Sequence, residues 1–359
     1  MSQRIELCLI GVPNVGKSLL FGLLTGTDPN SSEVPQSTLR PVLGTAEWKD
    51  ELTEKVAQKL RPEKVYLPEL VIHDTVGMNP DAGDGSKQLY AAHLAQARAA
   101  NHLLFVLGTF IKPSVSGCEP LLGQYRSLRQ ILCRCDLASI ERELPRVERM
   151  VQAKHLPEKT LRVLREAQEA VAKGVCLSTY ANLEPPVVSL FEKHGLLTHK
   201  RGAILVNMGD DDSPDVESLS PLRKETSQEA FAIKGNLEWE ITRMGAEEWE
   251  LLRDGFGGYR SRKKELWPFL LRALGYVKYY TFGHLGLKVW LLLRGGTALD
   301  AAKEMHSDMA KRFAGAEVFS VTDLEEGVDH AALRARGKVR RVNKDYIVQD
   351  DDVLYFGTA

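Results

Sequence analysis

Residues 5–18 read Ile-Glu-Leu-Cys-Leu-Ile-Gly-Val-Pro-Asn-Val-Gly-Lys-Ser, an apolar run that leads into the pattern Gly-x-x-x-x-Gly-Lys-Ser. The apolar run predicts a buried strand, and the residues from Lys17 onward predict a helix. Glycines let the backbone N–H groups of such a loop curl around phosphate oxygens at the positive end of the helix. Lys17 would supply charge to β and γ phosphates, and the Ser18 hydroxyl would bind Mg²⁺. The predicted phosphate-binding segment comprises Asn14, Val15, Gly16, Lys17, Ser18 and Leu19.

Strand and helix patterns alternate on both sides of this loop. Apolar strands are predicted at Leu70–His73 and Leu103–Leu107, with an alanine-rich helical stretch before the second. Strand patterns return at Ala203–Val206 and Phe231–Ile233. Continuous apolar strands separated by helices are typical of a parallel sheet that is covered on both faces. The sequence therefore predicts an α/β fold with a mostly parallel, doubly wound sheet.

The chain between these strand-rich regions has a helical pattern instead. Apolar residues recur at alternating spacings of three and four, at Leu137, Ile140, Leu144, Val147 and Val151 and, after a break at residues 155–157, at Leu161, Leu164 and Val171. Such spacing predicts an antiparallel helical hairpin inserted into the α/β domain, and Pro145 should kink its first helix.

The last part of the chain predicts a separate small unit. It should contain a strand at Leu287–Leu293, a helix at Ala298–Phe313 and short strands near Val318, near Val339, at Tyr346–Val348 and at Val353–Phe356. The predicted domains are the α/β domain at 1–123 and 196–279, the hairpin at 124–195 and the final unit at 280–359.

Two distant segments carry side chains that would complete a metal site. Asp74-Thr75-Val76-Gly77 follows a predicted strand and fits the pattern Asp-x-x-Gly, in which the Asp reaches Mg²⁺ through water and the Gly N–H contacts the γ phosphate. Thr38 lies between this motif and the phosphate loop, and we predict that it completes the metal shell. The predicted metal residues are therefore Ser18, Thr38 and Asp74, and the predicted catalytic residues are Lys17, Thr38 and Gly77.

A third segment has the character of a base-reading loop. Asn207-Met208-Gly209-Asp210 follows a buried-type strand and fits Asn-Lys-x-Asp except that Met208 replaces the Lys. An Asp at this place can accept hydrogen bonds from guanine, and we predict base contacts from Asn207, Met208 and Asp210 and from the backbone at Gly235. The alternative is that Asp210 is solvated surface beside two further aspartates.

The composition excludes several classes of protein. Lys and Arg number 47 against 48 Asp and Glu, so the chain does not bind nucleic acid through its overall charge. The start of the chain has no signal-peptide pattern, and no apolar stretch reaches the roughly 18 residues needed to cross a bilayer. Five scattered cysteines without a Cys-x-x-Cys pair predict reduced thiols. We expect a cytoplasmic monomer with no membrane segment.

The motifs and several longer stretches resemble the YchF-type subfamily of Obg-related P-loop GTPases and ATPases. These stretches are GVPNVGKS with LLFGLLTG, RPEKVYLPEL before DTVG, and NKDYIVQDDDVLYF near the end, so the resemblance covers almost the whole chain. It implies that residues 280–359 form a TGS module, which is a small β-grasp domain. It also implies an enzyme that hydrolyses GTP or ATP to the diphosphate and phosphate with Mg²⁺, and that contacts ribosomes or RNA through the hairpin and the TGS module.

The resemblance has consequences for turnover and for the base. Members lack the usual glutamine after Asp-x-x-Gly, and here Met78 takes its place, which predicts slow hydrolysis. Asn14 resembles an asparagine that helps some related GTPases hold K⁺ near the phosphates, so K⁺ is a second candidate cofactor. The family's glycine-rich second switch survives only as Gly83-Asp84-Gly85. Several members carry Glu in place of Asp210 and prefer ATP, so the choice between GTP and ATP stays open.

Two functions of other classes stay open from the sequence. One is a P-loop kinase acting on a small acceptor, against which the Asp-x-x-Gly motif and the 207–210 loop argue. The other is a scaffold that binds nucleotide and ribosome or RNA without hydrolysis. A basic stretch near the end could contact RNA phosphates or could guard a strand edge; it comprises Arg334, Arg336, Lys338, Arg340, Arg341 and Lys344.

Overall fold

The computed structural model describes residues 3–28, 42–47, 50–79, 87–111, 118–179, 185–212, 219–244, 246–283, 286–305, 307–324 and 330–358. Thr38 therefore lies outside the described residues. The chain forms two compact units. The first, here called the P-loop unit, comprises Glu6–Gly44 and Val71–Arg262, and the second, here called the C-terminal unit, comprises Met1–Ile5, Thr45–Leu70 and Lys263–Ala359. No helix in the described ranges is both long and apolar enough to cross a membrane.

The two units divide the chain differently from the predicted segments. Residues 45–70 and 263–279, predicted as part of the α/β domain, belong to the C-terminal unit. The predicted boundary at residue 280 falls inside a strand, β8 (Tyr276–Gly283). The sequence gives little indication that residues 45–70 belong to the C-terminal unit, because β3 (Val65–Tyr66) is only two residues long and pairs with β9 (Gly286–Leu293), more than 200 residues away.

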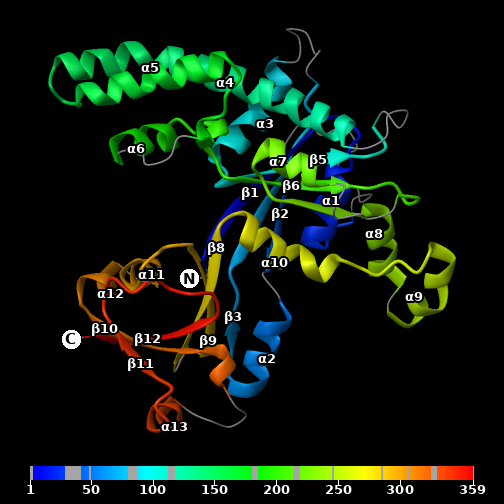
Figure 1. Ribbon diagram of the computed structural model, residues 1–359, viewed down its shortest axis with the longest axis vertical. Helices are drawn as coiled ribbons and strands as arrows, with labels where there is room; N and C mark the ends of the chain where they lie inside the picture. The colour runs from blue at the N-terminus through cyan, green and yellow to red at the C-terminus, as the bar shows by residue number, and fades with distance from the viewer. Residues whose placement is uncertain are drawn as a thin grey trace. The chain divides into compact units, whose positions relative to one another are not determined.

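The phosphate-loop motif lies at the end of a central strand of the first sheet (Figure 1). The strand order is β2-β4-β1-β5-β6-β7, and β1–β5, β5–β6 and β6–β7 are parallel pairs, which confirms the predicted α/β class. Its strands are β1 (Arg4–Gly11), β2 (Val42–Glu47), β4 (Glu69–Asp74), β5 (His102–Gly108), β6 (Gly202–Asn207) and β7 (Ala230–Ile233). The helices of the P-loop unit outside the hairpin are α1 (Lys17–Thr25), α3 (Lys87–Ala99), α7 (Ser220–Thr226), α8 (Gly235–Met244) and α9 (Ala246–Leu252), with a 3₁₀ turn at Arg253–Phe256.

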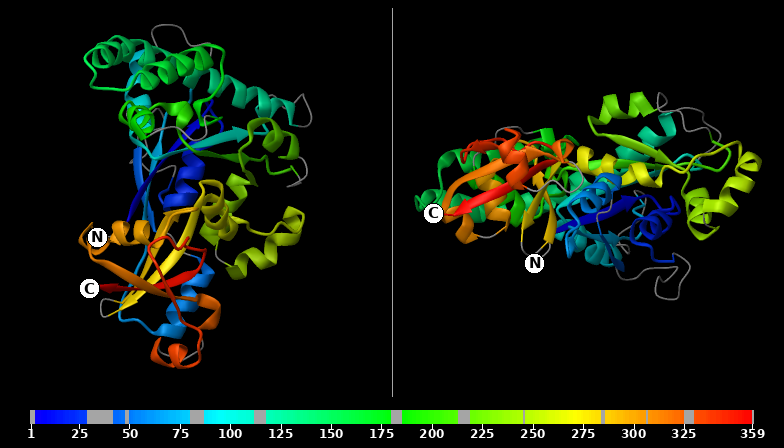
Figure 2. Two further views of the ribbon diagram at one scale, coloured as in Figure 1. Left: turned by 60° about the vertical axis from the view of Figure 1, so that its left-hand side comes forward. Right: turned by 90° about the horizontal axis from the view of Figure 1, so that it is seen from below.

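The inserted helical hairpin is confirmed. Helices α4 (Glu119–Gln152) and α5 (Glu158–Ala172) run side by side, as Figures 1 and 2 show, and α6 (Pro185–Lys193) follows them. The predicted stripe packs into a separate core: Ile140, Val147, Leu164 and Val171 are buried there. Helix α4 continues through Pro145, although a proline cannot donate the backbone hydrogen bond that a helix interior requires.

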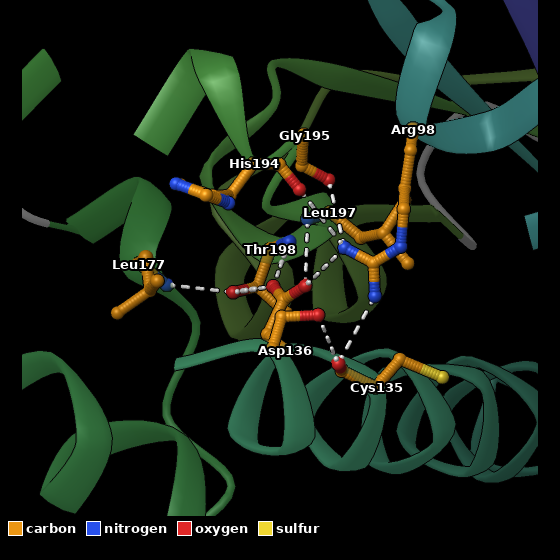
Figure 3. Close-up of polar contacts among 9 residues, drawn as sticks. Arg98, Cys135, Asp136, Leu177, His194, Gly195, Leu197 and Thr198 are labelled. Atoms are coloured by element: carbon orange, nitrogen blue, oxygen red, sulfur yellow. Dashed lines mark hydrogen bonds and ion pairs between the residues drawn. The ribbon is translucent and has the colours of Figure 1, made fainter. Parts of the chain in front are cut away.

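A buried ion pair anchors the hairpin to the rest of the P-loop unit (Figure 3). Asp136 of α4 is completely buried, and its carboxylate accepts hydrogen bonds from Leu197 N (2.9 Å), Thr198 N (2.7 Å) and Thr198 Oγ1 (2.8 Å). Arg98 of α3 lies 3.7 Å from this carboxylate and donates to main-chain oxygens that include Cys135 O. Burial raises the pKa of Asp136, and the hydrogen bonds from Thr198 and Leu197 oppose that shift. The fully bonded carboxylate fixes the middle of α4 to α3 and to the segment before β6.

The C-terminal unit contains the second sheet, in the order β11-β10-β12-β8-β9-β3. Strands β8 and β9 form an antiparallel pair, and the last strand returns parallel to β8, which is the β-grasp arrangement that was predicted. The strands not yet bounded are β10 (Phe313–Ser320), β11 (Arg340–Val342) and β12 (Asp352–Thr358), and the helices are α2 (Glu51–Leu60), α10 (Lys263–Ala273), α11 (Ala298–Met305), α12 (Ser307–Lys311) and α13 (His330–Ala335).

Two details of the predicted C-terminal unit are wrong. The helix predicted to reach Phe313 ends at Lys311, and Phe313 instead begins β10, where its ring meets that of Phe356. The strand predicted at Tyr346–Val348 is a single bridge between Thr297 and Ile347. Aromatic and β-branched residues at these places favour strand, and pairing with distant partners decides how far each strand extends.

Candidate functional site

The backbone of the phosphate loop is held in a conformation that two glycines make possible. Asn14 and Gly16 have left-handed backbones, with φ of 60° and 86°. A Cβ on Gly16 would lie 2.1 Å from Asn207 Nδ2, and a Cβ on Gly11 would lie 2.6 Å from Val106 O. Any side chain at either position would clash with its neighbours, so the glycines of the motif are required for this shape.

Lys17 lies inside the loop that it is predicted to serve. Its side chain is 7% exposed, and its ammonium group donates to Val12 O at 3.1 Å and to Gly11 O at 3.5 Å. Burial lowers the pKa of Lys17 to about 8, and the nearby Asp74 carboxylate opposes that shift. The ammonium group is therefore held at the loop by main-chain oxygens.

Ser18 and Asp74 come together from segments 56 residues apart. The Ser18 hydroxyl donates to Asp74 Oδ2 at 2.6 Å. Asp74 is 1% exposed, and its other oxygen, Oδ1, is buried without a hydrogen-bond partner in the described part of the chain. Burial raises the pKa of Asp74, and Ser18 and Lys17 lower it. An unsatisfied carboxylate oxygen beside a hydroxyl fits a hard cation such as Mg²⁺.

The Asp-x-x-Gly loop lies directly against the phosphate loop. A Cβ on Gly77 would lie 2.4 Å from Pro13 Cα and 2.6 Å from Pro13 N, so only glycine allows this approach. Met78 donates its N–H to Gly11 O at 2.9 Å, and its side chain is 1% exposed in the hydrophobic core. The side chain after Gly77 thus points into the core.

Asn207 links the phosphate loop to the loop after β7. Its side chain is 3% exposed; Nδ2 donates to Val15 O at 3.1 Å, and Oδ1 accepts from Gly235 N at 3.0 Å. Leu19 lies beside the same place, because a Cβ on Gly235 would be 3.0 Å from Leu19 Cδ2. This arrangement brings together four of the predicted nucleotide contacts, and it gives Asn207 a bridging role that the sequence did not indicate.

The other two residues predicted to contact the base from this loop, Met208 and Asp210, lie in different environments. Met208 is buried in the core, and Asp210 is exposed. The aspartate that holds the loop is Asp212, whose carboxylate accepts from Gly209 N at 2.9 Å and also from the Thr109 hydroxyl. The three adjacent aspartates gave no sequence signal to distinguish them.

Lys234 is a second residue that sequence reasoning missed. Its side chain is 7% exposed, its ammonium group donates to Asp210 O, and it lies 5.6 Å from the centre of the Tyr259 ring. Its position just before Gly235 was the only hint in the sequence. The pair of bonds from Lys234 and Asp212 fixes the main chain of the 209–212 loop.

The fold and these loops define the class of protein. The P-loop unit has a glycine-rich loop between β1 and α1, with a hydroxyl and a carboxylate beside it, and it has an Asn-x-x-Asp loop after β6. These are the parts of a P-loop nucleotide-binding protein of the GTPase and ATPase class.

Comparison with known proteins points to one family. Residues 6–134 match the model of the "50S ribosome-binding GTPase" family, and residues 276–358 match the C-terminal model of YchF GTPases, described as a protein of unknown function (DUF933). The chain is similar to members of the YchF family over almost its whole length. It is 26% identical to the ribosome-binding ATPase YchF of Bacillus subtilis over 97% of both chains, and 27% identical to an Obg-like ATPase homolog of Schizosaccharomyces pombe over 99% of this chain and 89% of that one.

A solved structure supports the fold over the whole length. The YchF GTPase of Schizosaccharomyces pombe matches with a TM-score of 0.74 at 20% identity, covering 99% of this chain and 98% of that chain. The match extends over both units, so the β-grasp sheet is part of the shared fold.

Proposed function

We propose that this protein is a Mg²⁺-dependent purine nucleoside triphosphatase that acts as a slow switch. The observation that carries the proposal is the contact between Ser18 and Asp74, 2.6 Å apart beside the phosphate loop, with one buried Asp74 oxygen unsatisfied. A hydroxyl and a carboxylate in this relation are the magnesium-binding pair of P-loop triphosphatases.

Some of these residues would bind the phosphates and Mg²⁺, and Gly77 would detect the γ phosphate. Lys17 would exchange its bonds to Val12 O and Gly11 O for phosphate oxygens, and the amides of the loop would surround those oxygens. Ser18 and Asp74, together with Thr38, would hold Mg²⁺, which neutralises charge on the phosphates when bound. The Gly77 amide would contact the γ phosphate. K⁺ beside the exposed Asn14 is a further proposal, and equal hydrolysis in K⁺ and Na⁺ buffers would remove it.

Slow turnover follows from the burial of Met78. A side chain that lies in the core cannot orient a water molecule for attack, so the chain offers no equivalent of the usual glutamine at that place. The same observation favours a second candidate, a nucleotide-gated scaffold that does not hydrolyse. Single-turnover release of phosphate with Mg²⁺ separates the two: measurable release supports the triphosphatase, and none supports the scaffold.

The base is proposed to be read at the exposed Asp210, whose carboxylate would accept from guanine. Titration of native protein and of Asp210→Ala with GTP and ATP tests this assignment. Loss of GTP binding alone would support Asp210, and unchanged affinities would discard it. Lys17→Ala should abolish the uptake of both nucleotides, and retained uptake would overturn the whole proposal.

A ribosomal or RNA partner is proposed from the relatives, whose names state that they bind ribosomes. The basic stretch gives this limited support. Arg340 and Arg341 lie on strand β11, at the edge of its sheet. Before that strand, Arg334 pairs with Glu317 (2.7 Å) and Lys338 pairs with Asp323 (3.1 Å). Cations on the edge strand and ion pairs beside it favour the interpretation that this stretch guards a strand edge. Co-sedimentation with ribosomes, with and without triphosphate, tests the partner directly.

A further inference from the structure

A buried histidine of α3 contacts the Asp-x-x-Gly loop. His93 is completely buried, and its Nδ1 accepts a hydrogen bond from Val76 N at 3.3 Å. Because an amide N–H can only donate, Nδ1 must carry a lone pair, and the ring acts as an acceptor there. Val76 is the residue before Gly77, so this bond holds the loop one residue away from the predicted γ-phosphate contact.

The loop is held on both sides of Gly77. Before it, the Thr75 hydroxyl donates to Leu9 O at 2.5 Å, and after it Met78 N donates to Gly11 O at 2.9 Å. Both of these bonds go to β1. The bond to His93 goes instead to α3, so it adds a second direction of support. A fixed Val76 amide restricts the dihedral angles of Val76, which set the direction of the next N–H, that of Gly77.

We propose that His93 is a positioning residue that aims the Gly77 amide at the γ phosphate. This inference rests on the proposed function. The amide of Gly77 would touch only the terminal phosphate, so its aim affects the binding of a triphosphate and leaves the binding of a diphosphate unchanged. His93 therefore sets the preference of the site for the triphosphate over the diphosphate.

Two substitutions separate the acceptor from the bulk of the ring. His93→Phe keeps an aromatic ring of similar volume and removes the acceptor, which leaves the half-buried Val76 N–H without this partner. His93→Asn keeps an acceptor, because the Asn Oδ1 reaches about the same place as Nδ1, and gives up part of the volume. A role in packing alone predicts that Phe is the milder change, and a positioning role predicts that Asn is.

The experiment is a titration of native protein and variants with a GTP analogue that resists hydrolysis and with GDP, both with Mg²⁺. We expect His93→Phe to lower the ratio of triphosphate to diphosphate affinity about three- to tenfold, the effect of one net hydrogen bond, and His93→Asn to restore it. His102→Phe is the control: His102 is also buried in the P-loop unit, where burial lowers its pKa to about 4, and it begins β5. The control should leave the ratio unchanged.

The outcomes also distinguish a failure of the positioning role of His93 from a failure of the proposed triphosphatase function. If native protein takes up no purine triphosphate, or if Lys17→Ala leaves that uptake intact, the proposed function fails. If native protein takes up the triphosphate but His93→Phe lowers both affinities equally, or neither, the positioning role is overturned and the function stands. A ratio that falls in His93→Asn as far as in His93→Phe also overturns it. Thermal unfolding of each variant confirms that the folded protein is being compared.

Discussion

Removal of the Asn207 side chain should separate the phosphate loop from the loop after β7. The amide is 3% exposed and satisfies two main-chain groups, Val15 O at 3.1 Å and Gly235 N at 3.0 Å. In Asn207→Ala both groups lose their partner, and each buried group left unsatisfied costs about 1–3 kcal/mol. Two such groups should lower the free energy of unfolding by about 2–6 kcal/mol, which is a large share of the stability of a domain.

The same substitution should weaken nucleotide binding. Val15 belongs to the turn that surrounds the phosphates, and once its carbonyl is released the amides beside it no longer hold their direction. We expect the affinity for a purine triphosphate to fall at least about tenfold, equivalent to about 1.4 kcal/mol. Urea unfolding measures the first effect, and titration with a fluorescent nucleotide, under conditions where the variant is folded, measures the second.

Asn101→Ala is the matched control. Asn101 is exposed, and its Oδ1 accepts one hydrogen bond from Glu6 N at 2.8 Å, so its loss should cost about 1 kcal/mol or less and leave nucleotide binding unchanged. If Asn207→Ala unfolds at the same urea concentration as Asn101→Ala and binds nucleotide like native protein, the bridging role of Asn207 is refuted.

Two further predictions test the charges of the P-loop unit. Because burial lowers the pKa of Lys17 to about 8 and a bound triphosphate favours the ammonium form, affinity for an adenine nucleotide should be constant below pH 8 and fall by up to tenfold per unit as the pH rises above it. Lys17→Arg, which stays charged, should bind more weakly without this slope, and an equal slope in both proteins contradicts the assignment. Asp136→Ala should lower the free energy of unfolding by about 3–5 kcal/mol, because it leaves Arg98 and the amides of the 197–198 segment without their carboxylate. The exposed pair of Glu225 and Arg126 is the control, and if Glu225→Ala destabilises as strongly in urea, burial is not the cause.

The fold could be predicted largely because its signals are local. The apolar run before Gly11 and the glycines after it specify a strand, a turn and a helix within a few residues, and the hairpin follows from a stripe that repeats along one helix. The assignment of residues 45–70 could not be predicted in this way. It depends on the pairing of β3 with β9, and a two-residue strand carries no pattern of its own.

In the candidate site, too, the residues that belong to a local motif could be predicted, and those whose role depends on a distant contact could not. Gly16, Lys17 and Ser18 were predicted from one motif, and the structure places Ser18 against Asp74 from a second motif. Thr38 stays a prediction outside the described residues. The role of Asp212, in contrast, depends on Thr109, 103 residues earlier. Nothing in the run of three aspartates indicates which of them holds the 209–212 loop in place.

The contacts that sequence reasoning missed share one property: each is made by a buried polar group whose partner is distant in the chain. His93 meets a loop 17 residues earlier, Asp136 meets residues 61 and 62 positions later, and Asn207 bridges to Val15 over 192 positions. A buried polar group without a partner is costly, so each of these contacts must form if the fold is to be stable. The motifs supply the atoms that would touch the nucleotide. The contacts of His93 and Asn207 decide whether those atoms are held in place, and the substitution of Asn207 should therefore change stability and nucleotide affinity together.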